Sequence, residues 1–244
     1  ATGARAFAPP VKGLDPEDAF LMRTVEDSIR FKERLKQKNV RHAVVIGASM
    51  AGIKVVEVLH KFGIETWLLD LASYIFPLAA YKEVAKEIEK RVEAQGVHLM
   101  FGVTIDHMEQ ENGEKTAVLT DGSRIPADIV GLCIGTRAIT ETVQGGVEIG
   151  GGIVVDDHMR TSVPGIYAAG DCCEGNNLES GQNQIIGLWA NANHQGETAG
   201  INMAGGDMAY KGNILHNITH FMNMDFIGFG DNRMQGEVLE YGSL

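Results

Sequence analysis

The chain has 244 residues, of which 44% are hydrophobic and 22% are charged, and this composition excludes disordered and collagen-like classes. A formal net charge of −11 argues against non-specific binding to nucleic acid or to an anionic membrane surface. The longest apolar run, residues 43–53, is too short to span a bilayer, so we expect a globular chain of one or two domains.

The first predicted element is a helix that follows a loop-like, proline-punctuated opening of 23 residues. Thr24 can cap this helix together with Asp27, and the helix is expected to end before Asn39. Residues 23–41 carry seven Lys or Arg against three acids, which we interpret as a solvated helix face in preference to a polyanion site. The inward face is expected to contain Val25, Ile29 and Leu35.

A strand, a glycine turn and a second helix come next. Residues 42–46, a histidine followed by four apolar residues, predict a buried strand that runs into the turn 47–52, and the helix after it stops at Gly63. A further strand over residues 64–70 completes a βαβ unit, which the right-handed crossover rule makes parallel. The inward residues of the second helix are expected to be Val55, Val56, Leu59 and Phe62.

The rest of the chain shows a third helix, which ends at Gly96, and several short strands. Residues 185–204 are compatible with another helix, and the residues from Tyr210 onward give mixed signals that predict no order. Asn-Gly and Asp-Gly turns between residues 105 and 125 favour antiparallel strands. The third helix would bury Val84, Ile88 and Val92, and the other strands are predicted at residues 97–101, 129–134, 153–155 and 166–169.

The turn after the first buried strand has the pattern of a dinucleotide site, written here G-x-S-x-x-G. Gly47 allows the tight turn, Gly52 permits close packing of helix on strand, and Ser49 stands where the second glycine is usual and can donate to phosphate. The helix that starts near Met50 and Ala51 points its amides and its positive end at the anion. A glycine-rich packing turn in some other α/β domain is the alternative.

Asp70 ends the next strand, 18 residues after Gly52. An acid at this position can accept hydrogen bonds from both ribose hydroxyls and repel a 2′-phosphate. The sequence therefore predicts a preference for NADH over NADPH.

The second signal is the string Thr-Ser-Val-Pro-Gly-Ile-Tyr-Ala-Ala-Gly-Asp over residues 161–171. It resembles the flavin-binding motif of the FAD-dependent pyridine nucleotide-disulphide oxidoreductases. The resemblance implies that Gly170 and Asp171 contact FAD, the aspartate holding its ribityl chain. Without the resemblance, Asp171 is an acid after an apolar strand, which is more often a turn cap than a ligand.

The resemblance extends over most of the chain. Residues 1–5 resemble the ATG motif that closes the first FAD segment of the family, and residues 42–135 resemble its inserted NADH domain. On this registration the earlier part of the FAD domain, which supplies the glycine motif for the ADP portion, is absent from this sequence. The implied FAD contacts are Thr2, Gly3, Arg5, Gly170, Asp171, Leu188, Trp189 and Ala190, and Gly135 joins Gly47, Ser49, Met50, Ala51, Gly52 and Asp70 as NAD contacts.

The expected fold class is α/β, with a Rossmann-like NAD(P)-binding domain that carries an inserted antiparallel meander, plus a partial FAD-binding Rossmann-like domain. The four predicted parts are the tail of the first FAD segment with a linker helix (1–38), the NADH-binding domain (39–140), the second FAD segment (141–209) and the start of a C-terminal interface domain (210–244). No side chain stands out as a general acid or nucleophile.

By resemblance, the parent protein passes hydride from NADH to FAD and then electrons to an acceptor such as oxygen, a disulphide or a redox protein. A homodimer is also implied. The alternative is a nucleotide-binding module without bound flavin and without turnover. Three cysteines make no disulfide framework, and nothing near the start resembles a secretory signal, so a cytoplasmic location is expected.

Several residues depart from the family pattern or invite a second interpretation. Lys54 lies where the family usually carries glutamate near the nicotinamide, and residues 136–138 lack the usual proline and asparagine. The cysteines are interpreted as structural or core residues. His216 and His220, four apart, would share a helix face, but two histidines without a third ligand make a weak case, and no metal is predicted. The cysteines are Cys133, Cys172 and Cys173.

Overall fold

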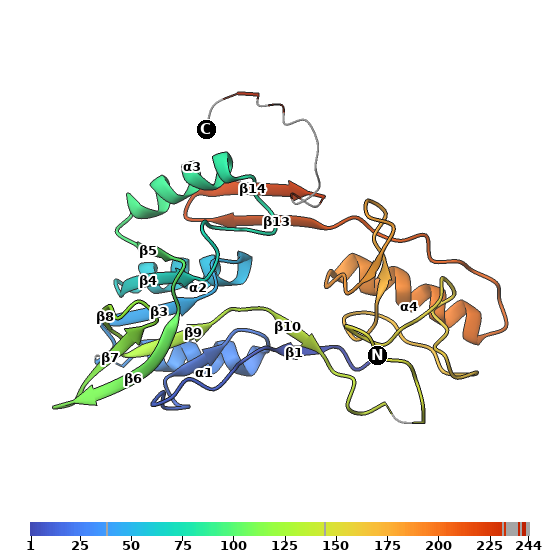
Figure 1. The fold of residues 1–244 in the computed structure, drawn as a ribbon, viewed down its shortest axis with the longest axis horizontal. Helices are drawn as coiled ribbons and strands as arrows, with labels where there is room; N and C mark the ends of the chain where they lie inside the picture. The colour runs from blue at the N-terminus through green and yellow to red at the C-terminus, as the bar shows by residue number, and fades with distance from the viewer. Residues whose placement is uncertain (38, 144, 231, 233–238, 240, 243–244) are drawn as a thin grey trace. The chain divides into compact units, whose positions relative to one another are not determined.

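The computed structural model describes residues 1–37, 39–143, 145–230, 232, 239 and 241–242 (Figure 1). The chain divides into two compact units. Unit 1 consists of Ala1–Arg5 and Thr136–His216, and unit 2 consists of Ala6–Gly135 and Asn217–Leu244. Among the helices of the described residues, none has the length and apolar character that a membrane span needs.

Unit 2 is built on a parallel sheet with the strand order β2-β9-β3-β4-β5 (Figure 1). The pairing of β3 with β4 runs from His42 opposite Glu65 to Ile46 opposite Leu69, so the predicted parallel βαβ unit is confirmed. On its other side β3 pairs with β9. The strands are β2 (Ala19–Leu21), β3 (His42–Ile46), β4 (Glu65–Asp70), β5 (His98–Phe101) and β9 (Ile129–Leu132).

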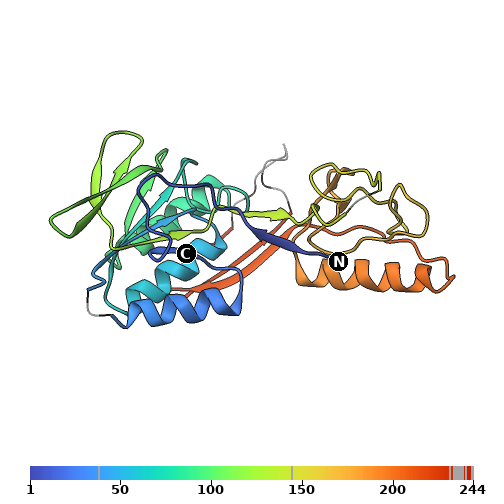
Figure 2. The same ribbon diagram turned by 90° about the horizontal axis from the view of Figure 1, so that it is seen from below.

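The two faces of this sheet are covered by different structures. Val45 and Leu68 belong to the core that the helices contribute to, whereas Val44 and Leu69 pack on an antiparallel meander. Figure 2 shows the green meander on one side of the sheet and the blue and cyan helices on the other. The helices are α1 (Val25–Leu35), α2 (Met50–Lys61) and α3 (Lys82–Glu93), and the meander strands are β6 (Ile105–Glu111), β7 (Glu114–Leu119) and β8 (Arg124–Pro126).

The predicted start of α1 is confirmed, and its predicted inward face is wrong in part. The Thr24 hydroxyl accepts from the Asp27 amide at 3.1 Å, and the Asp27 carboxylate accepts from the Thr24 amide at 2.9 Å. Val25 and Ile29, however, are 70% and 57% exposed. They lie six residues before Phe31 and Leu35, which are buried, and six residues turn a helix by about 240° beyond a full turn.

Two further residues that were predicted to lie on buried helix faces are partly exposed. Val84 is on the partly exposed side of α3, whose buried residues are Ala85, Ile88 and Val92. Phe62 follows the last residue of α2 as its C-cap and is 47% exposed. A four-residue spacing finds α3 but turns by about 40° at each step, so Val84 leaves the buried stripe that Ile88 and Val92 occupy.

The segment that the sequence left without order forms a hairpin of β13 (His216–Phe221) and β14 (Met224–Phe229). Met222 and Asn223 between the strands both have positive φ, the geometry of a two-residue type I′ turn. Phe221, Met222 and Phe226 are buried in the core that contains α2 and α3. The predicted helix face shared by His216 and His220 is wrong, because both histidines lie on a strand.

In the residues of unit 1 that the structure describes, α4 (Trp189–Met203) is the long helix, and the strands form short ladders. The ladders join β1 (Ala4–Ala6) to β10 (Thr136–Ala138) and β11 (Gly175–Asn176) to β12 (Asn183–Gln184). Residues 153–155 and 166–169 were expected to be strands, and this is wrong: they make only isolated bridges, such as Ile153 with Cys173. The buried side chains of α4 include the polar residues Asn191, Gln195, Thr198 and Asn202.

Candidate functional site

The glycine turn lies at the carboxyl end of β3, where the strand order changes direction. β4 and β5 follow on one side of β3, and β9 lies on the other. Gly47 has φ +105°, and a Cβ there would lie 2.3 Å from the Cys133 carbonyl oxygen. A Cβ on Gly52 would lie 1.9 Å from the Gly47 oxygen. Both positions therefore exclude side chains, and the crevice above the turn is where open α/β sheets bind their ligands.

The amino end of α2 leaves backbone amides directed at this crevice. Ile53 makes the first intrahelical bond, to the Ser49 carbonyl at 3.0 Å, so the amides of Met50 and Ala51 precede the helical ladder. Ser49 is the N-cap: its hydroxyl accepts from the Gly52 amide at 3.3 Å and donates to the Cys133 carbonyl at 3.0 Å. The Ser49 hydroxyl hydrogen, which was predicted to bond to phosphate, therefore bonds to the Cys133 carbonyl instead. The helix start carries no acidic side chain in its first turn, which suits an anion.

Asp70 lies beside the turn at the end of β4. One carboxylate oxygen accepts from the Ala48 amide at 2.7 Å, and the other accepts from the Ala72 amide at 2.8 Å. Each oxygen can accept a second hydrogen bond, so the half-buried carboxylate can still meet ribose hydroxyls. Asp70 therefore joins the glycine turn to the loop that follows β4.

That loop contains Phe76, which the sequence analysis did not single out. Phe76 is 2% exposed and has φ +55°, a left-handed conformation that costs a bulky residue about 1–3 kcal/mol. Its amide donates to the Ala48 carbonyl at 2.9 Å. Ala48 is thus bonded to the loop through both its amide and its carbonyl. No sequence signal finds this residue, because phenylalanine rarely adopts positive φ.

Lys54, the predicted departure from the family pattern, is bonded to the hairpin. Its ammonium donates to Glu57 at 2.5 Å and to the His220 carbonyl at 2.6 Å. Lys61 also donates to Glu57, at 3.0 Å, and the Met222 amide does so at 3.3 Å. Burial alone would raise the pKa of Glu57, but these hydrogen bonds outweigh it and lower that pKa to about 2. Glu57 and Lys54 therefore hold the hairpin on α2.

Gly135, the last residue predicted for NAD, follows β9 and is exposed with φ +102°. A Cβ there would meet nothing within 4 Å, in contrast to Gly47. Its carbonyl accepts from the Phe7 amide at 2.9 Å. All seven residues predicted for NAD thus lie in unit 2, and those predicted for FAD lie in unit 1.

In unit 1, the predicted flavin residues come from three segments. Gly170 has φ +82°, donates its amide to the Gln195 side chain at 2.8 Å, and leaves only 3.4 Å between an added Cβ and Ala192. Asp171 is half-buried, and a Cβ on Gly187 would lie 3.9 Å from its carboxylate. The motif at 170–171 and the residues before α4 are therefore neighbours.

The amino end of α4 resembles that of α2 in leaving its amides open. Leu188 is the N-cap and makes no side-chain capping bond, and the Ala192 amide makes the first intrahelical bond to it at 3.0 Å. Trp189, the first helical residue, is 85% exposed, and Ala190 after it is half-buried. This arrangement can meet a polar ring edge.

The first residues of the chain lie against the 170–173 loop. The Gly3 carbonyl accepts from the Ile139 amide at 2.9 Å, Thr2 donates to the Ile139 carbonyl, and Arg5 pairs with Glu141. A hydrogen bond from the Cys173 thiol, together with those from the backbone of Thr2 and Gly3, lowers the pKa of the Cys172 thiol to about 4. The structure thus brings Thr2 and Gly3 next to the Gly170–Asp171 motif.

The three cysteines are buried and form no disulfide. Desolvation raises the pKa of the Cys133 thiol to about 12, in keeping with a core position. In the described part of the chain, the group with metal-ligand spacing is Asp156, Asp157 and His158, on the surface of unit 1, and His216 and His220 are not part of it. His220 instead pairs with Asp225 at 2.8 Å.

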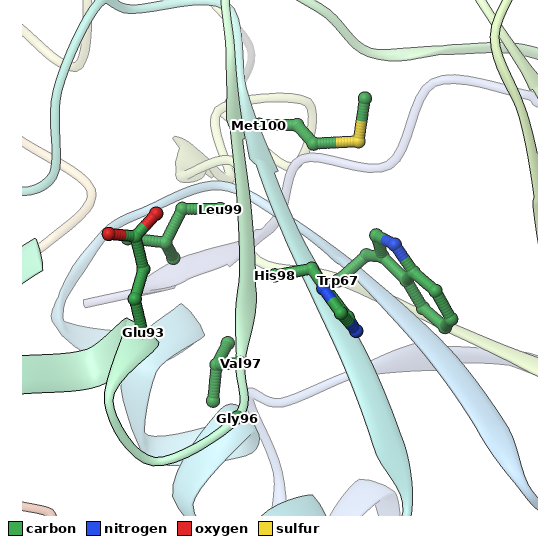
Figure 3. A pocket seen from close by; sticks show the side chains of 7 residues that line it. All are labelled: Trp67, Glu93, Gly96, Val97, His98, Leu99 and Met100. Atoms are coloured by element: carbon green, nitrogen blue, oxygen red, sulfur yellow. The ribbon is translucent and has the colours of Figure 1, made fainter. Parts of the chain in front are cut away.

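An open hollow of about 400 Å³ lies along the edge strand β5 (Figure 3). The Trp67 indole stacks on the His98 ring there, with 4.7 Å between centroids, and His98 bonds to Glu65 at 3.0 Å. None of the predicted site residues lines it. It is lined by Trp67, Glu93, Gly96, Val97, His98, Leu99 and Met100.

Comparison with known proteins places this geometry in a family. Residues 1–196 match the family described as pyridine nucleotide-disulphide oxidoreductase. A curated relative, the NADH oxidase of Methanocaldococcus jannaschii, is 30% identical over 207 residues, which cover 84% of this chain and 46% of the relative.

Solved structures give the same result. The water-forming NADH oxidase from Lactobacillus brevis, bound to NADH, is 26% identical with a TM-score of 0.87, covering 94% of this chain and 51% of that one. An engineered NADPH oxidase derived from it, bound to NADPH, is 25% identical with a TM-score of 0.86, covering 92% and 50%. The chain spans about half the length of these proteins.

The engineered oxidase carries five substitutions. They replace a glycine, an aspartate 18 residues later, the two residues after that aspartate, and a proline seven residues beyond it. The replacing residues are alanine, alanine, arginine, serine and arginine.

Proposed function

The chain belongs to the pyridine nucleotide-disulphide oxidoreductase family, and from this premise we propose that it is the NADH-binding and partial FAD-binding portion of a flavin-dependent oxidoreductase. The observation that carries the proposal is the constellation at the end of β3: two glycines that exclude any Cβ, the open amides of α2, and the Asp70 carboxylate. Together these groups suit a pyrophosphate and an adenine ribose.

Each group has a role in this proposal. The amides of Met50 and Ala51 bind the pyrophosphate at the positive end of α2, while Gly47 and Gly52 let the backbone approach it. The Ser49 hydroxyl fixes the turn through its bond to Cys133. Asp70 accepts from the ribose hydroxyls and repels a 2′-phosphate, and Gly135 borders the nicotinamide end.

A preference for NADH is supported by the spacing of the substitutions in the engineered oxidase. This chain has Gly52, Asp70 and Pro77 at the spacing of its replaced glycine, aspartate and proline. The two residues after the aspartate are Leu71 and Ala72, neither of which is cationic. All five positions thus carry residues that lack a partner for a 2′-phosphate.

In unit 1 we assign Asp171 to the ribityl chain of FAD and the amides of Trp189 and Ala190, with Leu188 beside them, to the edge of its ring; the Leu188 amide itself donates to the Ile186 carbonyl at 2.8 Å. Gly170 allows close approach, and Thr2, Gly3 and Arg5 border the same site. FAD, when bound, supplies the two-electron chemistry between NADH and the acceptor. The four parts 1–38, 39–140, 141–209 and 210–244, a homodimer, a cytoplasmic location, and a small molecule or redox protein as acceptor belong to the same proposal.

The sharpest test of the nucleotide assignment is the pair of variants that the comparison suggests. Asp70→Ala should weaken NADH binding by about tenfold or more and reduce the discrimination against NADPH, as measured by titration with each nucleotide. A variant that also carries Gly52→Ala, Leu71→Arg, Ala72→Ser and Pro77→Arg should bind NADPH in preference to NADH. Asp106→Ala, which removes an exposed acid on the meander, is the matched control. Unchanged affinities in all these variants would refute the assignment.

Flavin binding is tested by the absorbance spectrum. A yellow preparation whose flavin absorbance NADH bleaches supports the oxidoreductase, and Asp171→Ala should then lower flavin retention without changing NADH affinity. A colourless protein that still binds NADH would instead identify a nucleotide-binding module. A panel of acceptors, assayed by NADH consumption, distinguishes oxygen, disulphides and redox proteins.

A further inference from the structure

We propose that Phe221 and Phe226 of the β13–β14 hairpin are positioning residues for nucleotide selection. They hold Phe76 in its left-handed conformation and thereby fix the loop 71–80 that carries Leu71, Ala72 and Pro77. This inference rests on the proposed NADH site and adds a specificity determinant about 150 residues further along the chain.

The first step is the packing of three aromatic rings. The Phe76 ring meets Phe221 edge-on, with centroids 5.4 Å apart and planes at 89°, and meets Phe226 at 5.2 Å and 50°. All three side chains are buried, at 2%, 0% and 8% exposure. The edge-to-face pair with Phe221 and the tilted pair with Phe226 favour one position of the Phe76 ring over others, so the hairpin selects where Phe76 lies.

Second, the backbone of the loop 71–80 is also held by hydrogen bonds, from Asn232 and within the loop itself. The Asn232 side-chain amide donates to the Pro77 carbonyl at 3.2 Å and to the Ala80 carbonyl at 2.6 Å. The amides of Ala79 and Ala80 donate to the Phe76 carbonyl, both at 2.9 Å. A Cβ on Gly228 would lie 2.8 Å from the Ala79 carbonyl oxygen. The hairpin and Asn232 therefore contact residues 76–80 through both packing and hydrogen bonds.

The third step connects this loop to the glycine turn. Phe76 donates to the Ala48 carbonyl, and Ala48 donates to Asp70, whose other oxygen accepts from Ala72. A continuous run of contacts thus leads from Phe221 and Phe226 to the acid that we assign to the ribose.

The hairpin itself is fixed to α2. Glu57 accepts from the Met222 amide, and Lys54 donates to the His220 carbonyl. The hairpin is therefore attached to α2 through both a carboxylate and an ammonium group. Residues on its outer face, such as Phe229, which is 70% exposed, do not take part in the Phe76 cluster.

The expected consequence follows from the strain at Phe76. Without the rings of the hairpin, Phe76 leaves the left-handed region, and only a fraction of the molecules present Asp70 and Ala72 in the selective arrangement. Apparent NADH affinity falls by that fraction. NADPH, which gains nothing from Asp70, is less affected, so the discrimination between the two nucleotides decreases.

The experiment uses Phe226→Ala with Phe229→Ala as the matched control on the same strand. Phe226→Ala should raise the Kd for NADH by about five- to tenfold and that for NADPH by less than about twofold. Phe229→Ala should leave both constants within about twofold. Phe226→Leu, which keeps an apolar group against Phe76, should restore part of the discrimination. Equal losses for both nucleotides, or no loss for either, would overturn the proposal.

A second variant covers the case in which Phe226→Ala does not fold. Asn232→Ala leaves the ring cluster intact and removes only the two bonds to Pro77 and Ala80, and it should reduce the discrimination by about two- to threefold. No change in that ratio for Asn232→Ala and Phe226→Leu together would again overturn the proposal. Asp70→Ala separates the two hypotheses: if it leaves NADH binding unchanged, the site assignment has failed, and if it alone weakens binding, only the role of the hairpin has failed.

Discussion

The two units keep their structure by different means. Unit 2 has large aliphatic residues on both faces of a parallel sheet, against helices on one side and a meander on the other. Unit 1 has a smaller apolar cluster, and the buried face of α4 is largely polar. On this face Asn202 donates to the carbonyls of His158 and Met208, at 3.0 and 2.8 Å, and Gln195 accepts from Gly170.

This difference shows which residues determine the position of each candidate site. In unit 2, hydrophobic spacing forms the sheet, and the sheet then places the glycine turn. In unit 1, side-chain amides bond to loop backbone, so each loop depends on one or two polar residues. Four predictions test this difference between the units, and they follow in order of decreasing effect on the unfolding free energy.

The largest effect is expected at the turn of unit 2. Gly47→Ala forces a left-handed alanine and a clash with the Cys133 carbonyl, and it should cost about 3 kcal/mol or more of unfolding free energy and abolish NADH binding. Gly135→Ala is the control, since its φ of +102° is nearly the same but the added Cβ meets open space. Its cost should be about 1–2 kcal/mol in thermal or urea unfolding, from the positive φ alone. Equal costs would show that strain alone, and not the clash, determines the requirement.

The next effect is expected in unit 1. Gln195→Leu leaves the buried Gly170 amide without its acceptor and should cost about 1–3 kcal/mol, with loss of flavin retention. NADH affinity should not change. Thr198→Val is the control on the same buried face, because its hydroxyl bonds only to the His194 carbonyl of its own helix. If Thr198→Val lowers flavin retention as much as Gln195→Leu does, the loop does not depend on a single amide.

A smaller effect depends on pH. The pKa of Glu57 is lowered to about 2 in the folded chain, against an ordinary value of 4.5, so its stabilising contribution is complete above about pH 5 and is lost as the pH falls toward 2. Glu57→Gln should cost about 1–3 kcal/mol at pH 7 and much less near pH 2. Thermal melts of both proteins over this range measure the difference. If the melting temperatures of the two proteins changed with pH in parallel, the charge of Glu57 would not stabilise the hairpin.

The smallest effect is expected at Ile29, on the exposed face of α1, and the buried Phe31 of the same helix is the large-effect reference outside this order. Ile29→Gln changes an exposed residue and should alter the unfolding free energy by less than about 0.5 kcal/mol, whereas Phe31→Ala should cost about 3–5 kcal/mol. Urea unfolding of the two variants compares them directly. A large loss in Ile29→Gln would contradict the exposed position of this side chain.

The sequence predicted the parallel βαβ unit, the capping box at Thr24 and the glycine turn, because each depends on contacts within a short stretch of chain. The turn requires glycine at two positions for local steric reasons, and those reasons are visible in the pattern itself. The proposed FAD segment in unit 1 rests on a resemblance to a family motif and not on periodicity. The bridges around Ile153 are too short to produce an alternating pattern.

The remaining features depend on contacts between distant segments. The conformation of Phe76 is determined by Phe221 and Phe226, and nothing near Phe76 in the sequence encodes it. The hairpin was missed because its inner face packs on a helix far away in sequence, and Lys54 was noted only as a departure from the family. Its bond to the His220 carbonyl could not be inferred from spacing.

The two backbone bonds made by Asp70 have a practical consequence for protein engineering. The carboxylate that we assign to cofactor selection also accepts two backbone hydrogen bonds, so a library that randomises this position alone changes the stability of the turn together with the choice of cofactor. New acceptors for the amides of Ala48 and Ala72 would separate these two effects, so that a cation added for the 2′-phosphate is tested for cofactor choice alone.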